Sequence, residues 1–398
     1  MILNIIIFIA VLALLVLVHE FGHFLAAKKF KMFVEEFGFG FPPKIKGWKK
    51  GETVWSINSI PLGGFVKIAG EEGDQDADNR DSNTDSRGQN QEQTEIIAEE
   101  KEIGITTSGD VFERDVVVEE KFFPQADADG RGQEIPKDRY FSSKPIWQRI
   151  IVLISGVAMN FILGWLILVA VFVVGTKPVV VVSQVAKDSP AYTAGIKEGD
   201  KIVGYSDLNT LINYVNENKG KEITLTVKNG QDTREIKVTP RVNIPQGEGA
   251  LGVGLSAGGV ERQPFFTAVA DATQTAGIIF ATVYVMLFKL IASIFGGPNL
   301  FQYISGPVGI FQATSQAAGL GIGFLGNLVA IISLNLAALN IFPFPALDGG
   351  RVLFLIIEKI KGSPIKTRTQ QWVNGVGFAL LLVLILAASI QDIVRIFK

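Results

Sequence analysis

Four long apolar stretches alternate with polar segments along the chain, at about residues 2–27, 149–175, 322–346 and 372–391. Each is close to the roughly 20 residues that an α-helix needs to cross about 30 Å of hydrocarbon. The pattern therefore predicts a polytopic α-helical membrane protein with about four transmembrane helices. The first stretch lacks the basic start and the cleavage site of a signal peptide, so we expect it to be retained.

A fifth apolar stretch, residues 265–295, is harder to assign. If it crossed the membrane, the direction of the next span would reverse, and the basic loop at 351–368 would face outward. We therefore expect residues 263–320 to form amphipathic or re-entrant helices on the outer side, interrupted by the GGPN sequence at 296–299.

Basic residues indicate which side of the membrane each loop occupies. Lysines follow the first stretch at positions 28, 29, 31, 44, 46, 49 and 50, and five basic residues lie between positions 351 and 368, before the last stretch. Lysine and arginine are enriched in short cytoplasmic loops. We therefore expect both termini, and residues 176–262, to lie outside the cytoplasm.

The connection between the first two stretches has two parts. Residues 52–68, ETVWSINSIPLGGFVKI, predict a membrane-associated β-hairpin, because β-branched and aromatic runs flank a Pro-Leu-Gly-Gly sequence. With the first span, the hairpin forms a unit of residues 1–70. Residues 71–140 are polar and acidic, with about 20 acidic and 6 basic side chains up to residue 136, which predicts disorder. A solvated loop without a specific role is the simpler interpretation of this segment.

Residues 141–176 contain the second span, and a compact unit of strands follows at residues 177–262. The expected strands are VVVVSQV, DKIVGY, EITLTV and REIKVTP. Between them, DSPAYTAGIKEGDKIVGY at 188–205 resembles the signature of a PDZ domain. PDZ domains bind an extended peptide as an added strand at a sheet edge. We expect one extracytoplasmic α+β PDZ domain here; a PDZ-shaped unit that binds nothing is the alternative. Residues 321–398 then hold the third and fourth spans.

Composition narrows the possible chemistry. Hydrophobic residues make up 48% of the chain and charged residues 19%, and the mean hydropathy is +0.32, as in a membrane protein with additional water-soluble parts. The chain has no cysteine. Disulfides, iron–sulfur clusters, cysteine-bound zinc and a cysteine nucleophile are therefore excluded. We also expect no nucleic-acid partner.

The sequence VHEFGH at 18–23 ends the first apolar stretch and has the HExxH pattern of a zinc hydrolase. On a helix, His19 and His23 lie one turn apart on the same face and can bind one ion, while Glu20 is placed to act as a general base. Five residues with two free positions can recur by accident. However, the chain has only two histidines, and both lie in this motif. Ionisable groups inside an apolar span indicate function, because leaving them unpaired there is costly.

A catalytic zinc ion usually has three protein ligands and one open position for water. With no third histidine and no cysteine, the third ligand has to be a carboxylate. Asp348, in LNIFPFPALDGGR at the end of the third span, is the best candidate, because the predicted topology brings it to the same membrane depth as the histidines. The two prolines before it predict an unwound backbone, which is tolerated at this depth only inside protein or beside water. An aspartate that merely caps the next helix is the alternative.

These features together resemble the site-2 protease family. The shared features are the HExxH motif, a PDZ domain after the second span, and an N-x-x-P-x-x-x-L-D-G motif that here begins at Asn340 and includes Asp348. SIPLGG, KPIWQRI and SGPVGI also resemble the bacterial members that regulate sigma-factor signalling. The resemblance implies an intramembrane zinc metalloendopeptidase with His19, His23 and Asp348 as Zn²⁺ ligands and Glu20 as base.

The resemblance also implies further roles. Asn160 and Asn340 are candidate substrate-binding residues, although helix packing explains Asn160 equally well, and the hairpin is expected to capture the unwound substrate as an added strand. The expected partners are a transmembrane helix of a single-span protein such as an anti-sigma factor or a signal-peptide remnant, a peptide or ectodomain at the PDZ domain, and the lipid bilayer. The chain departs from the family pattern in having a single PDZ domain, a long acidic insertion and SGVAMNF without a Gly-Pro pair.

The expected location is the bacterial cytoplasmic membrane, with several crossings and the active site near the cytoplasmic face. A function of another class is a non-catalytic PDZ-bearing membrane scaffold with a structural metal. Structural zinc sites typically have four ligands, and only three candidates are present, which favours catalysis. A metal transporter with a site at the membrane midplane is disfavoured by Glu20 and by the depth expected for the motif.

Overall fold

The computed structural model describes residues 2–71, 101–105, 111–115, 135–205, 207–229, 232–245, 247–294, 296 and 305–397. Most of the acidic segment 71–140 lies outside these ranges, so its expected disorder is not tested. Within it, β3 (Lys101–Ile105) and β4 (Val111–Asp115) pair in antiparallel fashion. The expected interruption at 296–299 also lies outside, apart from Gly296.

Within the described residues, the helical part contains five helices that are long and apolar enough to span a membrane. They are α1 (Ile2–Lys29), α3 (Ile146–Val174), α6 (Phe265–Ile294), α8 (Ile322–Asn340) and α10 (Thr367–Phe397), with the shorter α7 (Pro307–Leu320) and α9 (Asp348–Lys361) between them. Four of the long helices correspond to the predicted spans. The fifth, α6, is continuous over 30 residues, so length and composition alone do not distinguish it from a span.

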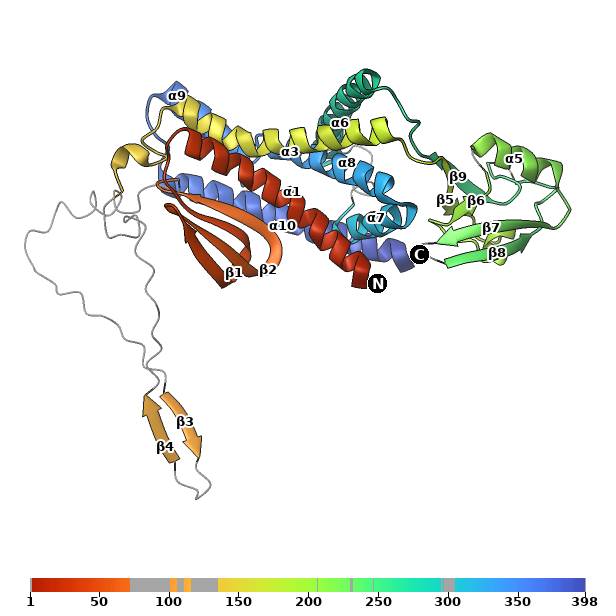
Figure 1. The fold of residues 1–398 in the computed structure, drawn as a ribbon, viewed down its shortest axis with the longest axis horizontal. Helices are drawn as coiled ribbons and strands as arrows, with labels where there is room; N and C mark the ends of the chain where they lie inside the picture. Colours follow the sequence, from red (N-terminus) through yellow and green to blue (C-terminus); the bar gives the residue numbers. More distant parts are fainter. Residues whose placement is uncertain are drawn as a thin grey trace, which may run out of the picture.

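Helix α3 lies at the centre of the helical part and packs on α1, α6, α8 and α9 (Figure 1). Small residues allow the close approach that helix packing in lipid requires. A Cβ atom added at Gly164 would come within 2.9 Å of the Ala330 carbonyl oxygen on α8. Ala272 and Ala276 of α6 are buried against α3. Because α3 packs on both α1 and α8, these contacts set the distance between α1 and the residues that follow α8.

Several helix ends meet at one end of the helical part. The Gln263 N–H, just before α6, donates to the Phe172 carbonyl near the end of α3 at 2.9 Å. Phe8 of α1 contacts Phe311 of α7, with 5.6 Å between ring centroids. Figure 1 shows both termini at this end of the helical part. The start of α6 and the start of α7 therefore lie on the same side of the bundle.

The first sheet is built from two long bent strands, β1 (Val34–Lys50) and β2 (Thr53–Ile68). The first half of β1 pairs on both sides, since Phe37 pairs with both Trp55 and Val66, while Trp48 in its second half pairs with Trp55. The segments therefore lie in the order 44–50, 53–58, 34–39 and 64–68.

This order corrects the predicted hairpin. The two runs of residues 52–68 do not pair with each other, because the first half of β1 lies between them. The tight turn is instead at Gly51 and Glu52, where Gly51 adopts a positive φ of 68° that favours glycine. The Pro-Leu-Gly-Gly sequence lies in the connection that crosses from the inner segment 53–58, past 34–39, to the edge segment 64–68.

Glu52 anchors this turn to the end of α1. Its carboxylate forms ion pairs with Lys28 at 2.6 Å and Arg139 at 2.7 Å. Burial by itself would raise the pKa of Glu52, but the two cationic partners outweigh that effect and hold the pKa below its ordinary value. The hairpin turn is thereby fixed against the helix that carries the histidines.

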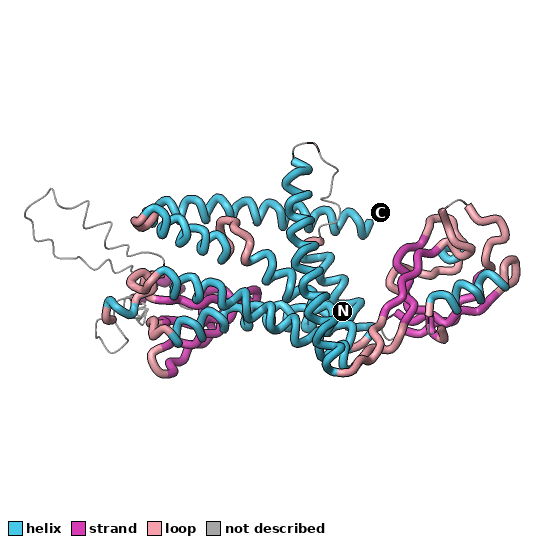
Figure 2. Tube along the Cα trace, turned by 90° about the horizontal axis from the view of Figure 1, so that it is seen from above, coloured by secondary structure: helices cyan, strands magenta, loops and turns pink. Residues whose placement is uncertain are grey.

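The second sheet lies at the opposite end of the helical part (Figures 1 and 2). It has five antiparallel strands in the order β8-β7-β6-β5-β9, with the bounds β5 (Val179–Val185), β6 (Lys201–Val203), β7 (Ile223–Asn229), β8 (Asp232–Val238) and β9 (Val253–Gly258). The four predicted strands are β5 to β8. The edge strand β9, which pairs with β5, was not predicted.

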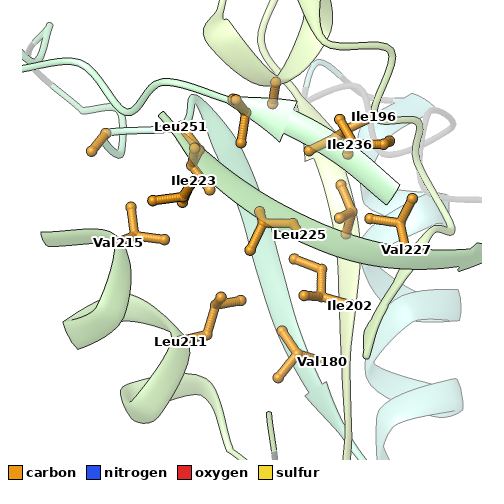
Figure 3. Packing of buried hydrophobic residues seen from close by; sticks show 14 residues of the cluster. Val180, Ile196, Ile202, Leu211, Val215, Ile223, Leu225, Val227, Ile236 and Leu251 are labelled. Atoms are coloured by element: carbon orange, nitrogen blue, oxygen red, sulfur yellow. The ribbon is translucent and has the colours of Figure 1, made fainter. Parts of the chain in front are cut away.

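A compact apolar core holds this unit together (Figure 3). Inward-facing residues of the strands, including Ile202 and Leu225, pack against Leu211 of α5 (Leu208–Glu217) and are almost fully buried. Ser189 caps the start of the short α4 (Pro190–Thr193), because its hydroxyl accepts the Tyr192 N–H at 3.1 Å. The resemblance of residues 177–262 to a PDZ domain stays a prediction.

Candidate active site

The two histidines lie on the buried face of α1, one helical turn apart. His19 and His23 are 9% and 8% exposed, and their Nε2 atoms lie 3.2 Å from each other. Successive turns of one helix therefore direct two imidazole nitrogens at the same point, as the HExxH spacing predicts.

Asp348 completes this cluster from a distant part of the chain. Its Oδ2 atom lies 2.9 Å from His19 Nε2 and 3.5 Å from His23 Nε2. The structure thus brings together the three residues that were predicted as metal ligands. Among the described residues, they form a group whose candidate ligand atoms all lie within 4.8 Å of one another.

A short unwound segment between α8 and α9 places Asp348. The helix α8 ends at Asn340, and Asp348 is the first residue of α9. The two glycines that follow allow the segment to fold tightly against the start of α9. A Cβ atom at Gly349 would lie 2.3 Å from the Ile341 carbonyl oxygen, and one at Gly350 would lie 2.2 Å from that of Phe344. Close backbone packing therefore requires both glycines after Asp348.

The donor set fits a zinc ion. Two imidazole nitrogens and one carboxylate oxygen are the ligand types of many catalytic zinc sites, which retain a fourth, open position. Asp348 Oδ2 is buried, and no protein donor within the described residues makes a well-directed hydrogen bond to it. A buried carboxylate oxygen facing two imidazoles is well explained as a ligand atom.

Glu20 lies beside this cluster and outside the group of three candidate ligands. The neighbouring segment of β2 passes directly over it, since a Cβ atom at Gly64 would lie 3.3 Å from Glu20 Cγ and 3.2 Å from Val16 Cγ1. The side chain is partly exposed. This arrangement places a sheet edge next to the carboxylate.

Helix α3 supports both histidines from behind. His23 Nδ1 lies 2.8 Å from the Val152 carbonyl oxygen. One turn along α3, Gly156 leaves the space that the rings occupy, because a Cβ atom there would lie 2.4 Å from His23 Nε2. Gly22 of α1 also allows the two helices to approach closely, because a Cβ atom there would lie 2.3 Å from the Ser155 carbonyl oxygen. Sequence reasoning missed both glycines; their occurrence within long apolar helices was the available signal.

The two asparagines predicted to contact substrate lie in different surroundings. Asn160 is 1% exposed, and its Nδ2 atom lies 3.5 Å from His19 Nδ1. Asn340 is partly exposed at the end of α8 and is not part of the His–Asp cluster. Contact of either residue with a substrate remains a prediction.

Comparisons with known proteins agree with this geometry. The model of peptidase family M50 matches residues 7–384. The chain is 34% identical over 425 residues to "Regulator of sigma-W protease RasP" of Bacillus subtilis (strain 168), with 99% of each protein covered. It is 31% identical to "Zinc metalloprotease RasP" of Geobacillus kaustophilus (strain HTA426), covering 99% of this chain and 98% of that protein.

A further relative, "Putative zinc metalloprotease LL2128" of Lactococcus lactis subsp. lactis (strain IL1403), is 30% identical, and both proteins are covered completely. These matches confirm the family resemblance identified from the sequence. Since the family model covers almost the whole chain and the similarity extends over full-length relatives, this protein belongs to peptidase family M50.

Proposed function

We propose that this protein is an intramembrane zinc metalloendopeptidase that cleaves transmembrane segments of single-span membrane proteins. The observation that carries the proposal is the cluster of His19, His23 and Asp348 beside Glu20, formed at the ends of apolar helices. Membership of a peptidase family and the names of the full-length relatives support the same activity and the same metal. The protein is a multi-pass membrane protein, and regulated intramembrane proteolysis is the process in which it would act.

The residues of the site divide the chemistry between them. His19, His23 and Asp348 would bind zinc, which polarises the scissile carbonyl group. Glu20, next to the cluster but not a ligand, accepts a proton from the attacking water and then donates it to the leaving amine. The apolar helices around the cluster exclude bulk water, so these charged groups interact more strongly than they would at a surface.

The sheet beside Glu20 offers a way to hold the substrate. A peptide bond inside an intact helix is shielded by its own hydrogen bonds, so the substrate has to unwind before cleavage. Segment 64–68 of β2 is at one edge of the first sheet, and Gly64 lies against α1 next to Glu20. An extended substrate that pairs with this edge as an added strand would present its backbone to the cluster. The exposed side of Asn340 is available for a further contact.

The proposed orientation places the active site near the cytoplasmic face of a bacterial cytoplasmic membrane and the PDZ domain outside. The lysines that follow α1 lie at the end that carries the first sheet, and the second sheet lies at the opposite end of the helical part (Figure 1). Gln263, just before α6, contacts the end of α3, and Gly306, just before α7, contacts Asp392 near the end of α10, so α6 and α7 both begin at the end that carries the second sheet. Because both helices begin on this side, we propose that α6 is re-entrant and that the chain returns to the outer side before α7.

The proposed role of the PDZ domain is to recognise the part of a substrate outside the membrane, either a peptide end or an ectodomain. The second candidate function is a non-catalytic PDZ-bearing scaffold with a structural metal. It is disfavoured because the described residues supply three ligands, whereas structural zinc is usually held by four. Glu20 would also have no role in such a scaffold.

Incubation of the purified full-length protein in lipid with single-span helical substrates tests the proposal. We expect cleavage within the hydrophobic segment, loss of cleavage with a zinc chelator and recovery when zinc is returned. Cleavage that is unaffected by the chelator, or restricted to soluble parts of the substrate, would show that the proposed function is wrong.

A further inference from the structure

Helix α3 presents three positions, one turn apart, to the paired histidines of α1. Val152, Gly156 and Asn160 follow one another at intervals of four residues, so they lie on one face of α3. Gly156 provides the space, and the other two positions each contact one imidazole ring. The side of each ring that faces away from Asp348 is therefore contacted by α3.

The contact with Val152 fixes the tautomer of His23. A carbonyl oxygen can only accept a hydrogen bond, so His23 Nδ1 carries the proton and donates it over 2.8 Å. Nε2 of the neutral ring then keeps its lone pair, and this is the atom that faces His19 and Asp348. His23 is thereby prepared for binding a metal ion through Nε2.

His19 needs an equivalent partner, and Asn160 occupies the corresponding place. The side-chain amide of Asn160 contacts His19 Nδ1 through Nδ2 at 3.5 Å, while its Oδ1 atom is buried without a hydrogen-bond partner in the described part of the chain. The two ends of an amide group have nearly the same shape, and a half-turn exchanges them. After that half-turn, Oδ1 accepts the His19 Nδ1–H, and Nε2 of the ring is left free.

We propose that Asn160 is a positioning residue that accepts the Nδ1–H of His19 and so fixes the tautomer in which His19 Nε2 binds zinc. This role differs from the substrate contact predicted for Asn160, and it agrees with a side chain that is only 1% exposed. Ser333 of α8 supports the same place, because its hydroxyl donates to the Asn160 backbone oxygen at 2.7 Å. Metal-binding histidines generally donate their second N–H to such a partner, which sets ring orientation and ligand basicity.

The proposal rests on the metal site of the proposed function, and zinc affinity of the full-length protein tests it without measuring proteolysis. Asn160→Leu keeps a similar volume but removes the acceptor, and we expect zinc binding to weaken by about 10–100-fold. Asn160→Asp keeps an acceptor that cannot donate, so we expect affinity at least as high as in the wild type. Thr273→Val is the matched control, because it removes a side-chain hydrogen bond to Trp165 of α3 but not the His19 partner, and its affinity should stay within about twofold.

The protein has only two histidines, so spectra of ¹⁵N-labelled histidine can be assigned to single rings. In the zinc-bound wild type we expect both rings as the Nδ1–H tautomer, and in Asn160→Leu a change in the Nδ1–H signal of His19 alone. Equal zinc affinity of Asn160→Leu and the wild type, or equal weakening by Leu and Asp, would overturn the proposal. Failure of the wild type to bind zinc would instead contradict the proposed function itself.

Discussion

The Oδ2 atom of Asp392, near the end of α10, lies 2.8 Å from the backbone nitrogen of Gly306, 86 positions earlier in the chain. The Gly309 N–H donates to the same oxygen at 2.8 Å. Gly306 precedes the first residue of α7, so a buried carboxylate from another helix satisfies N–H groups that have no partner within α7 itself. The SGPVGI sequence is thereby tied to the last helix of the protein.

We expect Asp392→Ala to loosen the first turn of α7 and to lower the free energy of unfolding by about 2 kcal/mol, the typical value for hydrogen bonds to a charged group. Hydrogen exchange at the Gly306 and Gly309 amides measures the local effect directly. Asp392→Asn keeps an acceptor and should show the smaller change. Unchanged exchange at both amides in Asp392→Ala would mean that α7 does not depend on this contact.

Two substitutions separate the ligand role from the base role. Glu20→Gln removes the base but no ligand, so we expect cleavage to be lost while one equivalent of zinc remains bound. Asp348→Ala removes one of three ligands, so zinc content and cleavage should fall together. Metal analysis and cleavage assays on the same preparations check both expectations. Loss of zinc in Glu20→Gln, or a full equivalent in Asp348→Ala, would reverse the assigned roles.

The close approach of α1 and α3 depends on Gly156. We expect Gly156→Ala to displace the imidazole rings, because the added Cβ atom would lie 2.4 Å from His23 Nε2 and 2.9 Å from His19 Cε1. Zinc affinity should fall at least tenfold, in the range seen when the surroundings of metal ligands are disturbed. Gly277→Ala in α6 is the control, since its Cβ atom meets nothing within 4 Å. Equal zinc affinity in the two variants would show that the helices adapt without cost.

The absence of cysteine allows single labels to test the orientation. Lys221→Cys, in the second sheet unit, should react with a membrane-impermeant thiol reagent from outside the cell. Ser363→Cys, after α9, should react only after the membrane is opened. Both positions are exposed, so a missing reaction reflects the side of the membrane rather than burial. Labelling of Ser363→Cys in intact cells would make α6 a full span.

The sequence was sufficient to predict that His19, His23 and Asp348 lie together, because its evidence was unusually specific. Both histidines of the chain fall in one motif, the lack of other ligand types left a carboxylate as the third ligand, and the predicted topology singled out Asp348. The first sheet was predicted less well. Local pattern shows that residues 52–68 favour strands, but it does not show that the first half of β1 inserts between the two runs, since that pairing depends on distant residues. β9 was missed for the same reason, because it pairs with β5 across most of the unit.

Supporting residues were also hard to predict from one sequence. Glycine and asparagine both occur in apolar helices without a functional role. The contacts of Gly156 and Asn160 with the histidines become visible only when α3 is placed against α1. The length of α6 was recognisable from its apolar run. The apolar run did not predict how α6 packs on α3 and α8. Near the end of α8, for example, the Tyr284 hydroxyl donates to the Ala338 carbonyl at 3.2 Å.

The last prediction concerns the second sheet unit as a filter for substrates. It lies at the opposite end of the helical part from the first sheet, so it can select on the outer part of a substrate but cannot orient the bond that is cleaved (Figure 1). The structure shows where to remove it. The Thr176 N–H donates to the Val260 carbonyl at 2.8 Å, so both ends of the unit meet at one point.

Deletion of residues 178–258 with a short Gly/Ser bridge therefore removes all five strands and should leave the helical part folded and able to bind zinc. We expect this variant to cleave substrates with large folded ectodomains that the full-length protein rejects, because the outer obstacle is gone. The comparison needs matched substrates with and without the ectodomain, and the variant's zinc content as a control for folding. If the zinc-loaded variant still rejects the untrimmed substrate, the outer ends of α6 and α7 become the candidate for exclusion, because they lie at the same end of the bundle as the deleted unit.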